Sequence, residues 1–235
     1  MKSTIKEIED RFNKDVERFS NLETGQQTTL DASFNMELIS EAIIRHYPNL
    51  KTVLDIGCGA GNYMVKLARK NPNIDVALSD LSQPMLDRAL SRVSTETSGK
   101  VDVFKGDFRA VDFGDKKFDV IIATAVLHHL REDEDWENAF TKIFNLLNEG
   151  GSIWIFDLVR QNSSTLQHYI YKDLYGQYLT DLKDEQYRDH VFAYIDKEDT
   201  PQTLIYQLNM LERVGFKKTD VLHKKLCFAS FVGFK

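Results

Sequence analysis

Three glycines separated by single residues follow a short apolar run, and this stretch constrains the fold more than any other part of the chain. Residues 52–56 have the length and β-branched content of a buried strand, and Gly57, Gly59 and Gly61 come directly after it. Residues 62–70 then show the spacing of an amphipathic helix. Such a unit forms a ligand cradle, because glycine lets a ligand approach the backbone and the first helical turn offers unpaired N–H groups.

The glycine spacing discriminates between cofactors. A dinucleotide-binding turn is G-x-G-x-x-G, which would need a glycine where this chain has Asn62, so an NAD-dependent oxidoreductase is disfavoured. The observed G-x-G-x-G stretch, Leu54 to Gly61, resembles the first motif of the class I S-adenosylmethionine (SAM) dependent methyltransferases. The resemblance covers residues 50–160 most strongly, and it implies SAM as the cofactor.

Strand and helix patterns alternate five times between residues 52 and 158, which predicts parallel βαβ units. The expected fold is α/β, a three-layer Rossmann-like architecture. Its seven-stranded, mostly parallel sheet carries an antiparallel C-terminal hairpin and a helical cap. We expect four regions: a helical arm or lid over 1–48, the SAM-binding core over 49–160, an aromatic cap over 161–200, and a final helix and hairpin over 201–235.

Two helices are expected before the core, over residues 3–20 and 33–46, because apolar residues recur there at spacings of three and four. In methyltransferases of this type the segment before the first strand often folds over the cofactor. Residues 19–29 are therefore a candidate for closing on it, a packing arm being the alternative. The last helix is expected to start at 199–201, with Pro201 in its first turn.

Acidic residues follow the second and third expected strands. Asp80 lies about 20 residues beyond the glycine turn, where an ionised carboxylate accepts hydrogen bonds from both hydroxyls of a ribose. The family keeps an acid after the third strand for the adenine amine, which Asp107 matches, although Asp112 is an alternative. The resemblance implies that SAM contacts Asp55, Gly57, Cys58, Gly59, Gly61, Asp80, Leu81, Met85, Gly106, Asp107, Phe108, Thr124 and Ala125.

Methyl transfer to a hydroxyl or thiol needs a nearby group that takes a proton. The candidates are His129 beyond the fourth strand, His168 and His190 in the cap, and Asp157 as an acidic alternative. Metal-dependent O-methyltransferases of similar fold need hard oxygen ligands after the fourth strand, where this chain has Thr124, so no metal is expected.

Composition limits the partners. The formal net charge of −6 and the scattered basic residues disfavour nucleic acid. The longest apolar run, residues 120–127, is too short to span a bilayer, and the start of the chain has no apolar leader-like segment. Cys58 and Cys227 show no disulfide or metal-site spacing. We therefore expect a cytoplasmic enzyme that acts on a small-molecule methyl acceptor, with the oligomeric state left open, a homodimer included.

Two alternatives stay open. The layout also resembles the enzymes that form or use carboxy-SAM in tRNA modification, in which an arginine of the cap pairs with the extra carboxylate. Arg188 is the candidate, whereas the regular glycine turn and the pair His128 and His129 favour plain SAM. The other alternative is a SAM-binding module without catalysis.

Overall fold

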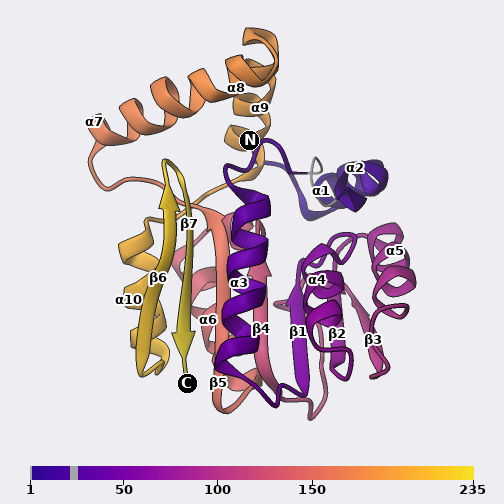
Figure 1. Cartoon of the computed structure of the whole chain (residues 1–235). Coiled ribbons are helices and arrows are strands. Elements are labelled where there is room, and N and C mark those ends of the chain that lie inside the picture. Colours follow the sequence, from indigo (N-terminus) through magenta and orange to yellow (C-terminus); the bar gives the residue numbers. More distant parts are fainter. Residues whose placement is uncertain (1, 22–25) are drawn as a thin grey trace.

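One seven-stranded sheet runs through the chain, of which this computed structural model describes residues 2–21 and 26–235 (Figure 1). The strand order is β3-β2-β1-β4-β5-β7-β6, and β7 runs antiparallel to both of its neighbours. The parallel strands pair in register, with Leu54 opposite Ala77 and Ile121. The bounds of the strands are β1 Thr52–Ile56, β2 Asp75–Asp80, β3 Val101–Lys105, β4 Phe118–Thr124, β5 Leu147–Leu158, β6 Lys218–Lys225 and β7 Phe228–Phe234. The expected mostly parallel sheet with a C-terminal hairpin is confirmed.

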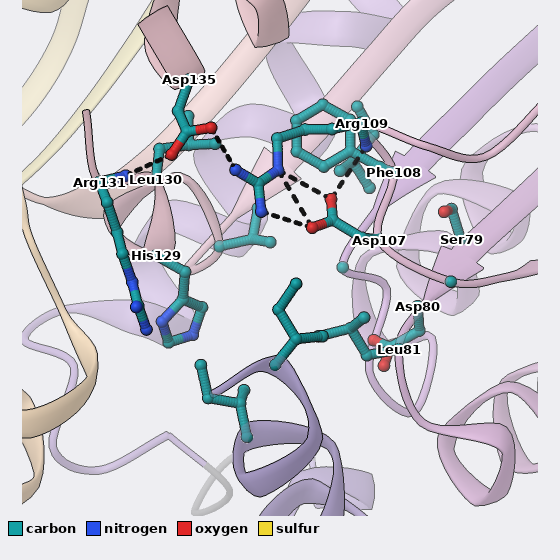
Figure 2. A pocket seen from close by; sticks show the side chains of 16 residues that line it. Ser79, Asp80, Leu81, Asp107, Phe108, Arg109, His129, Leu130, Arg131 and Asp135 are labelled. Atoms are coloured by element: carbon teal, nitrogen blue, oxygen red, sulfur yellow. Dashed lines mark hydrogen bonds and ion pairs between the residues drawn. The ribbon is translucent and has the colours of Figure 1, made fainter. Parts of the chain in front are cut away.

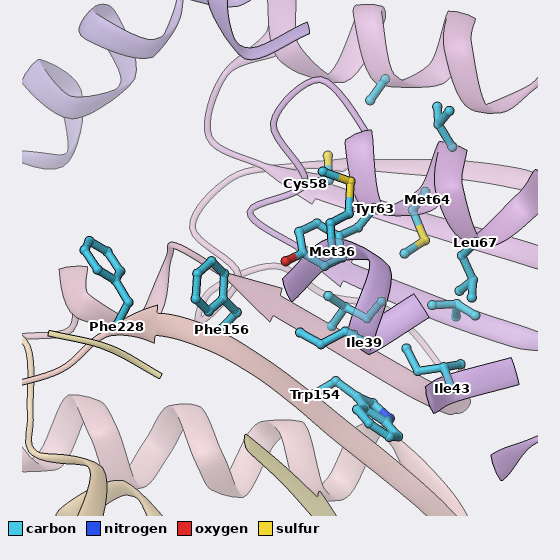
Figure 3. Close-up of a cluster of buried hydrophobic side chains, with 14 of the residues drawn as sticks. Met36, Ile39, Ile43, Cys58, Tyr63, Met64, Leu67, Trp154, Phe156 and Phe228 are labelled. Atoms are coloured by element: carbon cyan, nitrogen blue, oxygen red, sulfur yellow. The ribbon is translucent and has the colours of Figure 1, made fainter. Parts of the chain in front are cut away.

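Helices cover both faces of the sheet, because its central strands are apolar on both sides. One face packs against α3 (Ala32–His46), α4 (Asn62–Lys70) and α5 (Gln83–Val93). Figure 3 shows this cluster, in which side chains of α3 and α4 meet Trp154 and Phe156 of β5. The other face packs against α6 (Asp133–Leu146) and α10 (Leu204–Val214). These two layers hold the carboxyl ends of the parallel strands at one rigid edge.

The N-terminal arm is not the single helix that the apolar spacing predicted. It forms α1 (Ile5–Phe12) and α2 (Val16–Ser20), with a break between them. Asn13 caps α1, and its side-chain oxygen accepts a hydrogen bond of 2.6 Å from the hydroxyl of Ser82 at the start of α5. This contact with the core replaces continuation of the helix. The segment 19–29 lies partly outside the described residues, which omit 22–25.

The cap consists of α7 (Ser164–Gln167), a π-helix η2 (His168–Tyr175), α8 (Gly176–Leu182) and α9 (Glu185–Glu198). Two of its tyrosines bind the arm, since the hydroxyls of Tyr175 and Tyr178 donate to the carbonyls of Thr28 and Gln27. The final helix begins at Leu204 with Thr203 as its N-cap, after the expected start at 199–201. Residues 199–203 instead form an extended connection. Among the described residues no helix combines the length and the apolar character needed to cross a membrane.

Candidate functional site

In the glycine turn after β1, Gly57 is closely packed whereas Gly59 borders open space. A Cβ atom at Gly57 would lie 2.7 Å from Cγ2 of Val126, so this glycine allows close packing. Gly59 has φ +49°, and a Cβ there would meet no atom within 4 Å. Its N–H donates a hydrogen bond of 2.8 Å to Oδ2 of Asp80. The backbone of Gly59 therefore borders empty space directly beside a carboxylate.

Asp80 is held by the backbone on both of its oxygens. Oδ1 accepts from the N–H of Ser82 at 2.8 Å, while Oδ2 accepts from Gly59. Burial raises the pKa of this carboxyl, and the backbone donors counteract only part of that effect. Asp55 lies deeper, with its carboxyl 2 % exposed and one oxygen without a partner among the described residues. Asp80 is thus a fixed acceptor at the end of β2.

Three cavities meet at this edge of the sheet. The glycine-loop cavity, of about 100 Å³, is lined by Gly59, Asp80, Met85 and Phe19 among others. The β3-side cavity, of about 170 Å³, is lined by Asp80, Asp107, Phe108, and Ile5 and Ile8 of α1 (Figure 2). The cap-side cavity, of about 80 Å³, is lined by residues of the arm, of the strand ends and of the cap: Arg11, Phe12, Phe19, His128, Asp157, Tyr175, Tyr194 and Asp199.

His129 joins these spaces, because it is part of the wall of all three cavities. Phe12 and Phe19 of the arm line both the glycine-loop and the cap-side cavities. The ring of Phe12 stands edge-on to His129, with 6.3 Å between the ring centroids. A ligand that fills the first two cavities would therefore meet a second ligand in the cap-side cavity near His129.

Asp107 is paired with a neighbouring arginine. Its Oδ2 accepts from Nη2 of Arg109 at 2.5 Å, and Arg109 also contacts Asp135 of α6 at 2.6 Å (Figure 2). Burial alone would raise the pKa of Asp107, but the hydrogen bonds from Arg109 outweigh it and hold the pKa below its usual value. Arg109 was not anticipated from the sequence, because nothing near it indicates that α6 supplies a second carboxylate.

Two histidines and two carboxylates cluster beyond β4 and β5. Leu127–His129 form the short helix η1, and Oδ2 of Asp157 accepts the N–H groups of Leu127 and His128. Oδ1 of Asp157 contacts Nδ1 of His128. On the other side, Oδ1 of Asp199 lies 3.1 Å from Nδ1 of His129 and 3.7 Å from Nε2 of His128. Burial would lower the pKa of His128, but Asp157 and Asp199 raise it to about 9.

Most of the predicted cofactor residues line the glycine-loop or β3-side cavity: Gly57, Cys58, Gly59, Asp80, Leu81, Met85, Gly106, Asp107, Phe108, Thr124 and Ala125. Asp55 and Gly61 stand behind that wall; a Cβ at Gly61 would lie 3.1 Å from Cβ of Ala89. Phe19 and Gln26, which belong to the segment 19–29 that was expected to close on the cofactor, line the glycine-loop cavity. Phe12 lines the same cavity and was predicted only as an apolar position of the first helix.

The predicted proton acceptors separate into two groups. His129 and Asp157 lie at the cap-side cavity. His168 and His190 are exposed on the cap, where His168 faces Asp173, so the structure does not place these two histidines in the site. Asp199 was missed, because its sequence context suggested a helix start rather than a partner for His129.

Arg188 also lies on the outside of the cap. Its guanidinium contacts Asp189 at 2.9 Å and Glu185 at 3.8 Å, and it does not line the three cavities described above. The arginines at the cap-side cavity are Arg11 and Arg18 of the arm. Arg11 pairs with the buried Glu198 of α9 at 2.5 Å, and Arg18 pairs with Asp15 at 2.9 Å.

Residues 53–151 match the family model of a methyltransferase domain. The carboxy-S-adenosyl-L-methionine synthase of Nautilia profundicola is 24 % identical over 97 % of this chain and 100 % of that protein.

Two solved structures share the fold. The magnesium protoporphyrin IX methyltransferase of Synechocystis, solved with S-adenosylhomocysteine (SAH), superposes with a TM-score of 0.64 at 16 % identity, covering 98 % of this chain and 99 % of that one. A plantazolicin methyltransferase, also solved with SAH, gives a TM-score of 0.64 at 14 % identity, covering 99 % of both chains. They confirm the expected Rossmann-like fold.

Proposed function

We propose that this chain, in which residues 53–151 form a class I SAM-dependent methyltransferase domain, transfers a methyl group from SAM to an oxygen, nitrogen or sulfur atom of a small molecule. The observation that carries the proposal is the shared wall at His129, where the glycine-loop cavity meets the cap-side cavity. SAM would occupy the glycine-loop and β3-side cavities, and the acceptor would occupy the cap-side cavity.

The residues present fit SAM. The open position at Gly59 leaves room for the cofactor against the backbone, and Asp80 stands beside it as an acceptor for ribose hydroxyls. Phe108 and Leu81 provide apolar walls for the adenine in the β3-side cavity. Asp107 is already bonded to Arg109, so its carboxylate would accept a hydrogen bond from the adenine amine in addition to those from Arg109.

When bound, SAM supplies a methyl group on a positively charged sulfur, and loss of that methyl leaves neutral SAH. The chain must position the acceptor atom in line with the methyl and exclude water. Phe12, Phe19 and Tyr194 enclose the cap-side cavity on the arm and cap sides. We assign the removal of the acceptor's proton to His129, which faces all three cavities and is paired with Asp199.

Calorimetric titration with SAM and SAH tests the cofactor site. We expect micromolar binding to the wild-type protein and a loss of at least tenfold in Asp80→Ala, because the ribose would lose its acceptor. Asp75→Ala is the matched control, since Asp75 lies at the opposite end of the same strand and binds the N–H of Lys100. Absence of binding to either ligand in the wild type would refute the proposal.

The acceptor is then identified by screening small molecules for SAH release. Compounds with hydroxyl, amine or thiol groups and an apolar ring fit the enclosed, aromatic character of the cap-side cavity.

The free cysteines Cys58 and Cys227 are both buried, which fits the cytoplasmic location expected from the sequence.

A second candidate function is synthesis of carboxy-SAM, which the relative from Nautilia profundicola favours because the match spans its whole length. Arg188 does not reach the cavities, so Arg11 or Arg18 would have to pair with the carboxylate. Mass spectrometry of the nucleotide that co-purifies with the protein separates the two functions. Carboxy-SAM in the purified protein would favour the second candidate, whereas SAM or SAH alone would favour methyl transfer.

A further inference from the structure

We infer that His128, His129 and Asp199 bind a divalent transition-metal ion at the cap-side cavity. The three side chains each offer one ligand atom, and these atoms all lie within 4.8 Å of one another. Two imidazole nitrogens and one carboxylate oxygen form a donor set that suits zinc, cobalt, nickel or ferrous iron better than magnesium or calcium. The expectation of no metal rested on Thr124 after β4 and on the spacing of the two cysteines, and it did not include these three residues.

The distances between the ligand atoms fit a single ion. Oδ1 of Asp199 lies 3.1 Å from Nδ1 of His129 and 3.7 Å from Nε2 of His128. Ligand atoms at about 2.0 Å from a tetrahedral ion are separated from one another by about 3.3 Å. The observed values lie on either side of that separation.

Two of the ligand atoms lack other partners. Nδ1 of His129 and Oδ1 of Asp199 are buried, and neither has a hydrogen-bond partner among the described residues, although they lie 3.1 Å apart. The side chain of Asp199 is only 3 % exposed. The two atoms are paired with each other at a distance at which a cation between them would contact both. The inference depends most on the grouping of three ligand atoms from His128, His129 and Asp199 within 4.8 Å of one another.

Surrounding contacts hold the ligands in place. Asp157, 1 % exposed, contacts Nδ1 of His128 and so leaves Nε2 directed at Asp199. A carboxylate behind a ligating histidine is the usual way in which proteins orient it. The backbone next to Asp199 is attached to η1, because the N–H of Thr200 donates to the carbonyl of His128 at 2.7 Å and its hydroxyl donates to Leu130 at 2.9 Å.

The carboxylates also favour a positive charge at this position. Asp157 and Asp199 flank His128, and their two carboxylates would attract a divalent ion to this position. Three protein ligands leave at least one coordination position for a ligand from the cap-side cavity, as in catalytic rather than structural metal sites.

The role of the ion rests on the proposed function, whereas its binding does not. A hydroxyl of the acceptor that coordinates the ion would ionise more easily, and its proton would pass to water. The resulting oxyanion would form the new bond to the methyl carbon, while the electron pair of the broken bond stays on the sulfur. His129 would then act as a ligand rather than as the base.

The test is titration of the chelator-treated full-length protein with Co²⁺ at neutral pH, followed by calorimetry and visible absorption. We expect one ion per chain and absorption bands of a four- or five-coordinate cobalt site, with no binding of Mg²⁺. Asp199→Asn should weaken binding at least 100-fold, and His129→Gln should do the same. Asp157→Asn should weaken it about 10- to 100-fold, the effect known for partners behind metal ligands.

His223→Gln is the matched control, because His223 of β6 pairs with Asp31 at 3.0 Å, does not line the cap-side cavity and should leave cobalt binding unchanged. Circular dichroism and SAM titration of each variant report whether it folds. No saturable cobalt binding in the wild type would overturn the inference, as would binding that survives in both Asp199→Asn and His129→Gln. SAM binding without cobalt binding refutes only the metal site, and cobalt binding without SAM binding refutes only the proposed function.

Discussion

Replacement of Gly59 by alanine should have two separate effects. Strain in the backbone should lower the stability of the fold, and loss of space should lower the affinity for SAM. Gly59 has φ +49°, and nothing lies within 4 Å of a Cβ built on it. Alanine in this left-handed region costs about 1–2 kcal/mol, and it regains about 0.4–1 kcal/mol because the unfolded chain has less freedom. We therefore expect the free energy of unfolding of Gly59→Ala to fall by about 1 kcal/mol, measured by urea denaturation.

The effect on SAM binding should be larger than this strain explains. The new methyl group would occupy space that we assign to the cofactor, and overfilling of a packed site costs about 1–3 kcal/mol. That cost corresponds to a loss of affinity of about 5- to 150-fold. The N–H of residue 59 stays available to Asp80, so the loss would not come from that hydrogen bond.

Gly114→Ala is the matched control. Gly114 has φ +60° and no atom within 4 Å of a built Cβ, but it lies in the loop before β4, away from the glycine turn. It should show the same loss of stability with unchanged SAM affinity in calorimetry. The reasoning fails if Gly59→Ala binds SAM as the wild type does, or if both variants lose affinity equally.

Three further predictions concern single contacts. Burial would raise the pKa of Asp107, but Arg109 holds it below its usual value. The stability that this pair adds should therefore be complete above the unfolded pKa of about 4 and should decline as the pH falls below it. The difference in unfolding free energy between the wild type and Arg109→Ala should shrink accordingly between pH 7 and pH 3. Burial raises the pKa of Cys227 to about 12, so iodoacetamide at pH 8 should alkylate it only after unfolding, as mass spectrometry would show; rapid labelling of the native protein would contradict this. Tyr175→Phe removes the hydrogen bond to the carbonyl of Thr28 and should lower the free energy of unfolding in urea by about 1 kcal/mol; an unchanged value would mean that this contact between cap and arm adds nothing.

Features that depend on residues close to one another in the chain were predictable from the sequence. The glycine turn, Asp80 and the alternation of strands and helices follow from short patterns, because parallel strands bring their carboxyl ends to one edge. The same rule placed His129 and Asp157 at that edge. The grouping of these residues around the glycine-loop and β3-side cavities was therefore largely accessible without a structure.

Features that depend on contacts between distant segments were not predictable. Asp199 meets His129 only because the connection after the cap returns to η1, 70 residues from it in the chain. His168 and His190 resembled candidates for the site, but which face of a cap helix points inward depends on packing. The break at Asn13 has the same origin, since Ser82 lies 69 positions away.

The arm and the cap are joined by direct contacts beside the cap-side cavity. Arg11 of α1 pairs with Glu198 of α9, and the N–H of Ser3 donates to the carbonyl of Lys197 at 3.0 Å. Phe12 and Phe19 of the same arm also form walls shared by the glycine-loop and cap-side cavities. Displacement of the arm would therefore open both cavities at once. The consequence is kinetic: exchange of the cofactor and entry of the acceptor share one opening step, so their rate constants should change together when the pair of Arg11 and Glu198 is broken.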